Sequence, residues 1–186
     1  MNGIELLPVG EISVAVLDEL RAGLVSVFRV RCEILDERLD PSFAFHAERK
    51  QYHSSQILAR MRNALRGGTQ RLGVAGVDLY IPILTFVFGE AEVGGASAVV
   101  SFHRLRQEFY GLPAAPEIER QRLLKEAAHE VGHTLELTHC DDYRCAMAPS
   151  HSVEWIDLKD AAFCHDCRET VFQAWNGNTA RAGRPR

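Results

Sequence analysis

The segment of residues 129–140, HEVGHTLELTHC, constrains the fold and the chemistry of this chain more than any other part of its sequence. On a helix, His129 and His133 lie one turn apart on the same face, so both imidazoles can reach one metal ion. Neutral imidazole nitrogens suit zinc, and three protein ligands leave a fourth position for water, whose pKa then falls to about 7. Glu130 would lie beside that open position. The segment therefore predicts a helix that carries a catalytic zinc site.

A third ligand, His139, requires the helix to end soon after His133. In a continuous helix, at about 100° per residue, its side chain would point about 120° away from the ligand face. Such breaks usually contain glycine at positive φ, but this chain has Glu136 there, where the left-handed region costs a non-glycine residue about 1 kcal/mol or more. We predict that Glu136 nevertheless adopts positive φ. The alternative is a long helix in which the histidines occur by chance.

Four cysteines follow in a CxxxxC pattern and then a CxxC pattern, the spacing of a closed site of four thiolates: Cys140, Cys145, Cys164 and Cys167. Structural zinc is the natural occupant of such a site. Two disulfides or a redox CxxC are the alternatives, and His151 or His165 could replace a thiolate. Residues 1–5 do not open a signal peptide, so we expect a cytoplasmic chain whose thiols stay reduced. Cys32 lies in an alternating apolar pattern and is expected to be a core residue.

The histidine segment, followed by Cys145-Ala146-Met147 and by Cys164-His165-Asp166-Cys167, resembles the archaemetzincins, whose pattern is HExxHxxGxxHC, CxxxxCxM and a distal CxxC. The likeness runs over residues 86–167, and it departs from the family at Glu136, where the pattern has glycine. It implies two zinc ions per chain. The catalytic zinc would be bound by three histidines: His129, His133 and His139. The structural zinc would be bound by four cysteines: Cys140, Cys145, Cys164 and Cys167.

The resemblance also implies roles for two further residues, Glu130 as the general base and Met147 as the methionine of a Met-turn beneath the metal. In such enzymes the strand at the rim of the cleft binds the substrate as an added antiparallel strand, which takes its affinity from main-chain hydrogen bonds. We predict that four residues form this strand: Ala98, Val99, Val100 and Ser101. An ordinary edge strand is the alternative.

Hydrophobic periodicity predicts an α+β fold, with a mixed α/β sheet packed on helices. Helical spacing occurs in residues 13–27, 51–65, 117–135 and 152–175. Strand patterns occur in residues 4–9, 28–35, 76–80, 84–88 and 98–102. The resemblance implies a metzincin-like arrangement with a small C-terminal helical subdomain. We predict one catalytic domain of residues 1–175, with subdomains of about 1–138 and about 139–175, and a flexible basic tail of residues 176–186.

The chemistry predicted for these residues is hydrolysis of a peptide bond by zinc-bound water, with Glu130 taking the proton and passing it to the leaving amine. The resemblance suggests a zinc metallopeptidase that acts on short peptides, with an aminopeptidase as one form of this activity. A zinc-stabilised binding module with little or no peptidase activity is the alternative, although such a module has no chemical need for Glu130. A thiol redox protein is a third interpretation.

Length, composition and charge bound the remaining possibilities. A chain of 186 residues with 46% hydrophobic residues can bury a sizeable core as one domain. A net charge of -4 argues against a general nucleic-acid binder, and no apolar run reaches the length of a membrane span. We therefore expect a cytoplasmic monomer that acts on a peptide or protein substrate and binds neither nucleic acid nor membranes.

Overall fold

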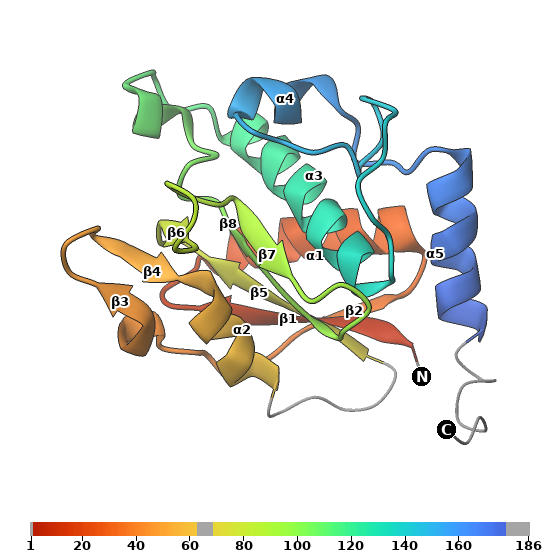
Figure 1. Cartoon of the computed structure of the whole chain (residues 1–186), viewed down its shortest axis with the longest axis horizontal. Coiled ribbons are helices and arrows are strands. Elements are labelled where there is room, and N and C mark those ends of the chain that lie inside the picture. The colour runs from red at the N-terminus through yellow and green to blue at the C-terminus, as the bar shows by residue number, and fades with distance from the viewer. Residues whose placement is uncertain (1, 63–68, 178–186) are drawn as a thin grey trace.

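A five-stranded sheet with helices on both faces forms the centre of the protein (Figure 1). The structure, a computed structural model, describes residues 2–62 and 69–177. The strand order is β2-β1-β5-β8-β7, and every pair is parallel except β7 and β8. These strands are β1 (Gly3–Val9), β2 (Arg31–Ile34), β5 (Thr69–Ala75), β7 (Gly89–Ala91) and β8 (Ser97–Ser101). The single antiparallel strand, β7, thus lies at one edge of the sheet.

The helices and a second, smaller sheet surround this centre. The helices are α1 (Val14–Phe28), α2 (Ser54–Arg62), α3 (Pro116–Thr134), α4 (Val153–Leu158) and α5 (His165–Gly177). Two short 3-10 helices are η1 (Pro41–Ala44) and η2 (Gln107–Tyr110). The three-stranded sheet has the order β3-β4-β6 and comprises β3 (Phe45–His46), β4 (Gln51–His53) and β6 (Leu79–Tyr80). The predicted α+β fold is confirmed.

Alternating residues of the central strands bury opposite faces of the sheet. In β1, Ile4 and Leu6 belong to the core that includes α1 and α3, whereas Leu7 and Val9 belong to the core that includes α2. Successive strand residues point to opposite sides, so a sheet covered on both faces needs apolar residues at nearly every position. All five residues of β8 are accordingly buried.

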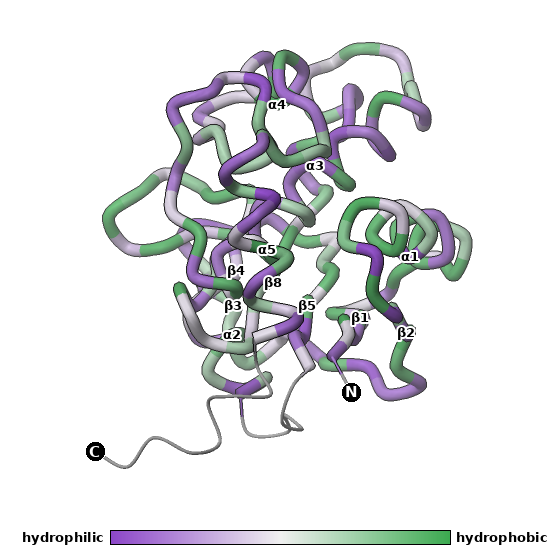
Figure 2. Tube along the Cα trace, turned by 90° about the vertical axis from the view of Figure 1, so that its right-hand side faces the viewer, coloured by the Kyte–Doolittle hydropathy of each residue, from purple (hydrophilic) through white to green (hydrophobic). Residues whose placement is uncertain are grey.

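The C-terminal elements pack on the α1 side of the molecule. The ring of Phe28, the last residue of α1, lies 5.3 Å from that of Phe163 and 6.4 Å from that of Trp175 in α5. In Figure 2 α1 is mostly hydrophobic, with a few hydrophilic residues, and its buried side includes Leu17 and Leu20. The contact of Phe28 with Trp175 joins the first helix, α1, to the last, α5. Among the described residues, no helix is long and apolar enough to cross a membrane.

Several predicted elements differ from the structure. Residues 84–88 form no regular strand and share only an isolated bridge between Val87 and Leu79, while the predicted strand of residues 76–80 is reduced to β6. The central strand β5 was not predicted, because Arg71 and Gly73 interrupt its apolar pattern. Residues 63–65 of the predicted second helix, and residues 178–186 of the predicted tail, lie outside the described residues.

Candidate metal centres and active site

Helix α3 carries the first two histidines and is fixed in the core by its apolar face. Pro116 occupies the first helical turn, where its missing N–H costs no hydrogen bond, and acidic residues in that turn interact favourably with the helix dipole. Leu123, Ala127 and Val131 are buried against the sheet and α1. The helix therefore presents its last two turns, with His129 and His133, at a defined place beside the sheet.

The rings of His129 and His133 are oriented for metal binding. Their Nε2 atoms lie 3.1 Å apart, and the Nδ1 atoms lie 2.8 Å from the backbone oxygens of Ala146 and Leu137, respectively. A carbonyl oxygen can only accept, so Nδ1 donates and Nε2 presents its lone pair. Two imidazole nitrogens on one tetrahedral zinc would be about 3.3 Å apart. Histidine ligands of metals are commonly held by such hydrogen bonds from their other nitrogen.

The structure brings His139 to the same place. Its ring centroid is 5.3 Å from that of His129 and 5.2 Å from that of His133, and one ligand atom from each of the three lies within 4.8 Å of the others. Burial, followed by the nearby charge of Lys159, lowers the pKa of His129 to about 2. Burial also lowers the pKa values of His133 and His139. Neutral imidazoles are the form that a metal needs.

Helix α3 ends where the third histidine requires it to end. Glu136 has a φ of 69°, so the prediction of positive φ is confirmed. The N–H groups of Leu135 and Leu137 donate to the carbonyl of Gly132, and the N–H groups of Glu136 and Gly94 donate to the carbonyl of His133. These bonds satisfy carbonyls that a helix end leaves without partners. The turn between β7 and β8, which contains Gly94, thus holds the hinge from outside.

The four cysteines predicted to bind a second metal also converge. One sulfur from each lies within 4.8 Å of the others, and the Sγ atoms of Cys140 and Cys164 are 3.8 Å apart. Two thiolates on a tetrahedral zinc would be separated by about 3.8 Å. The Sγ of Cys145 accepts the backbone N–H groups of Met147 and Cys164. All five cysteines of the chain are described, and each is a free thiol, so the alternative of two disulfides is not what the structure shows.

Three other residues singled out from the sequence are not part of either metal group. Burial raises the pKa of the Cys32 thiol to about 12, in agreement with a core residue. His165 is exposed and lies beside Asp166, outside the four-thiolate group. His151 lines the cleft next to the histidine group but is not part of it. Neither histidine therefore replaces a thiolate.

Met147 lies directly against α3. It is fully buried, and a side chain at Gly132 would overlap its sulfur. Glycine at position 132 thus leaves the space that the Met147 side chain occupies. The carbonyl of Met147 accepts the N–H of Cys140 at 3.0 Å. The segment with Met147 is thus tied both to the active-site helix and to the first cysteine.

A buried ion pair that the sequence did not predict supports this segment. Lys159 is fully buried, and its Nζ lies 2.7 Å from the carboxylate of Glu126 and donates to the backbone oxygens of Ala146 and Ala148. Ala146 O therefore accepts from both Lys159 and His129. A lysine in a polar stretch looks exposed in the sequence, because nothing local shows that its partner comes from α3.

Glu130 lies in a cleft of about 530 Å³ that is also lined by the three histidines, Glu126 and residues 84–91. Burial raises the pKa of Glu130 well above its ordinary value. Gly89 of β7 lies against its carboxylate, since a Cβ at that position would be 2.6 Å from the Cγ of Glu130. The cleft thus places a carboxylate on α3 beside the histidine nitrogens and against an edge strand of the sheet.

The prediction for the substrate-binding strand is wrong. The predicted residues, Ala98, Val99, Val100 and Ser101, belong to β8, which lies between β5 and β7 and is hydrogen-bonded on both sides. A strand with two neighbours cannot accept a third. The edge is formed by β7, whose residues line the cleft. The sequence pattern of these residues predicted a strand, but it could not show where in the sheet that strand lies.

The sequence of this chain matches that of a known peptidase family. The model of peptidase family M54 matches residues 16–173. This chain belongs to peptidase family M54. It is 42% identical to the archaemetzincin of Methanocaldococcus jannaschii over 86% of this chain and 87% of that protein. It is 35% identical to the archaemetzincin of Haloarcula marismortui, over 90% and 98% of the two chains.

Solved structures of archaemetzincins and a related peptidase have the same fold. The archaemetzincin of Archaeoglobus fulgidus, complexed with malonate, superposes with a TM-score of 0.78 at 36% identity, covering 90% of this chain and 99% of that one. A zinc-dependent peptidase of Methanocorpusculum labreanum superposes with a TM-score of 0.83 at 29% identity, covering 91% and 100%. The predicted archaemetzincin resemblance is confirmed. The chain is a member of a zinc-dependent metallopeptidase family, and its substrates are peptides.

The strained hinge of this archaemetzincin gives a stability prediction. Glu136→Gly should be more stable than Glu136→Ala by about 1 kcal/mol in the zinc-loaded protein, because both variants lose the interactions of the Glu136 side chain but only glycine adopts positive φ without a Cβ clash. Thermal unfolding should show a melting temperature for Glu136→Gly that is about 2–4 °C above that of Glu136→Ala. Glu19→Gly, in the middle of α1, is the control and should melt below Glu19→Ala. A melting temperature for Glu136→Gly equal to or below that of Glu136→Ala would show that the hinge is not strained.

Proposed function

We propose that this archaemetzincin hydrolyses peptide bonds with a catalytic zinc at His129, His133 and His139 and with Glu130 as the general base. The observation that carries this proposal is the convergence of three imidazoles next to the buried carboxylate of Glu130. Zinc, when bound, supplies Lewis-acid activation of water and of the substrate carbonyl. The donor set and its spacing fit that metal.

Glu130 would move the proton of the reaction. Its carboxylate takes a proton from the attacking water and delivers it to the nitrogen of the leaving amine. Its position beside the histidines and against Gly89 keeps the carboxylate next to the reacting atoms, which both proton transfers require. One residue thereby serves as base and then as acid.

The substrate backbone would be bound by β7. This strand has one neighbour in the sheet, β8, so its other edge is available to an extended peptide that adds as a further strand. Glu90 of β7 accepts hydrogen bonds from the hydroxyl groups of Ser54 and Ser55 at the start of α2. These contacts fix the strand from the side opposite to Glu130.

Removing the proposed base should abolish cleavage but not metal binding. Glu130→Gln should lower the rate of peptide cleavage by about 10²–10⁴-fold while the zinc content stays that of wild type, because glutamine cannot accept the proton. Mass spectrometry of a mixed peptide library would measure cleavage, and elemental analysis would measure zinc. Acetylated peptides in the same library would test the aminopeptidase form, which requires a free amine. Zinc without any Glu130-dependent cleavage would favour a binding module.

A side chain at Gly89 should displace that base. Gly89→Ala places a methyl group against the Glu130 carboxylate, so we expect a loss of cleavage of about 10²-fold with zinc content preserved. Gly89→Ala should lower the melting temperature of the wild-type protein. The same substitution should not lower the melting temperature of the Glu130→Ala protein, where the methyl group has room. Gly177→Ala, where a Cβ meets nothing within 4 Å, is the control. An equal decrease in both backgrounds would exclude the contact.

We further propose that Cys140, Cys145, Cys164 and Cys167 bind a structural zinc that helps to hold His139. His139 and Cys140 are adjacent in the chain but belong to different metal groups. A metal at the four sulfurs would therefore restrict the backbone that presents the third histidine. This restriction offsets part of the cost of the Glu136 hinge.

This coupling predicts an effect at a distance. Cys164→Ser should weaken zinc binding at the histidine group by about tenfold, although Cys164 is not one of its ligands. Competition with a zinc chelator would measure the affinity of each site. Cys32→Ala, which removes a buried thiol outside both groups, is the control. Unchanged affinity at the histidines would count against the coupling.

A further inference from the structure

We propose that residues 84–88 form an apolar recognition wall in the cleft and that Arg49, Gln51, Asp78 and Arg104 fix this wall from outside. The enzyme would therefore select peptides with a bulky apolar side chain beside the cleaved bond. This inference rests on the proposed peptidase function and adds the class of substrate to it. The four fixing residues are positioning residues, because none of them lines the cleft.

The recognition wall presents apolar side chains to the same cleft as the histidines and Glu130. Leu84 lines the cleft and is 48% exposed. Phe86 and Phe88 contact each other edge to face, with ring centroids 5.1 Å apart. Val93 also lines the cleft and is exposed. A substrate side chain seated here would remove these apolar groups from water.

The charged groups of the cleft favour an apolar partner over a charged one. Within residues 2–62 and 69–177, no lysine or arginine lines it. Glu126 pairs with Lys159 and accepts from Ser150, while Glu90 accepts from Ser54 and Ser55. A glutamate side chain of the substrate would gain no cationic partner here, and a lysine side chain would gain only carboxylates that already accept hydrogen bonds from Lys159 or from serine hydroxyls, so neither recovers the full cost of losing water.

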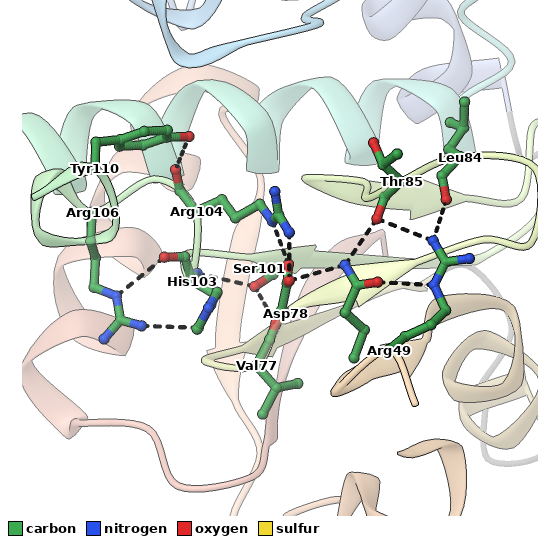
Figure 3. Close-up of polar contacts among 11 residues, drawn as sticks. Arg49, Val77, Asp78, Leu84, Thr85, Ser101, His103, Arg104, Arg106 and Tyr110 are labelled. Carbon is green, nitrogen blue, oxygen red and sulfur yellow. Dashed lines mark hydrogen bonds and ion pairs between the residues drawn. The ribbon is translucent and has the colours of Figure 1, made fainter. Parts of the chain in front are cut away.

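Residues 84–88 depend on side chains for their position. Three backbone hydrogen bonds hold the segment to its surroundings, from Leu84 N to Ile81 O at 3.0 Å, from Val87 N to Leu79 O at 2.9 Å and from Ser101 N to Phe88 O at 2.8 Å. Arg49 adds two more, donating to the backbone oxygens of Leu84 at 2.7 Å and Thr85 at 3.2 Å (Figure 3). Because Arg49 holds the backbone carbonyls of Leu84 and Thr85, the side chains of the recognition wall can face the cleft.

Asp78 connects these contacts to the rest of the fold. It accepts two hydrogen bonds from Arg104, at 2.6 and 2.7 Å, and one from Gln51 at 3.0 Å (Figure 3). The same amide nitrogen of Gln51 also donates to Thr85 O at 2.9 Å. The guanidinium of Arg104 lies 4.2 Å from the ring centroid of Phe86. The network therefore holds both the backbone and one aromatic side chain of the recognition wall.

Binding of defined peptides to zinc-loaded Glu130→Gln protein tests the proposal without requiring cleavage. The probes are fluorescently labelled, acetylated peptides of one length that carry phenylalanine, glutamate or lysine at a single central position. We expect the phenylalanine peptide to bind about tenfold more tightly than either charged peptide. Leu84→Asp should remove this preference. Equal affinities for the three peptides would overturn the proposal.

The role of the network is tested by Arg49→Met, with Arg21→Met as a matched control, since Arg21 pairs with Asp18 on α1. Arg49→Met should weaken phenylalanine-peptide binding about fivefold and, in the cleaving enzyme, raise KM with kcat within about twofold. Arg49→Lys, which keeps the charge but loses the forked contact, should weaken binding less. If the Arg49 variants bind as tightly as Arg21→Met, the network does not position the wall.

Failure of the two proposals can be distinguished. If Glu130→Gln protein prefers the phenylalanine peptide but wild type cleaves neither the three acetylated peptides nor the same peptides with a free amino terminus, the peptidase proposal fails and the recognition wall stands. If wild type cleaves the three peptides at equal kcat/KM and Glu130→Gln binds them equally, the recognition wall falls and the peptidase proposal stands.

Discussion

The end of α3 is the constraint on which the site depends. A helix that continued past Thr134 would carry His139 away from His133, and with it Cys140 away from the other three cysteines. The chain instead turns at Glu136, where a non-glycine residue is held at a φ of 69°. Hydrogen bonds from Leu137 and from Gly94 of the neighbouring turn satisfy the last carbonyls of the helix. Both metal groups follow from this one change of direction.

A second dependence runs through a buried charge. Lys159 is fully buried with Glu126, and burial of an ion pair is costly unless both partners are well hydrogen-bonded. Here the ammonium has three acceptors, and one of them, Ala146 O, also orients His129. Loss of the lysine would leave Glu126 buried beside Glu130 without compensation. The C-terminal part of the chain thus sets both the geometry and the electrostatics of residues on α3.

Local sequence predicted the parts of the site whose spacing is local. The histidines and cysteines were predictable because metal ligands recur at fixed separations, and the hinge at Glu136 because helix geometry left no other route to His139. The place of β8 within the sheet, the strand β5 and the pairing of Lys159 with Glu126 were not predictable. Each depends on which distant segments become neighbours, and period-2 or charge patterns do not encode that order.

The length of β7 has a consequence for the behaviour of the protein in concentrated solution. An uncovered sheet edge is a template for pairing with any other extended chain, including a second copy of the same protein. Strand β7 offers only the residues Gly89–Ala91 before the chain turns away at Gly94. Such a short edge limits accidental self-association to a few hydrogen bonds. The protein can therefore leave one edge open without making it a nucleus for aggregation.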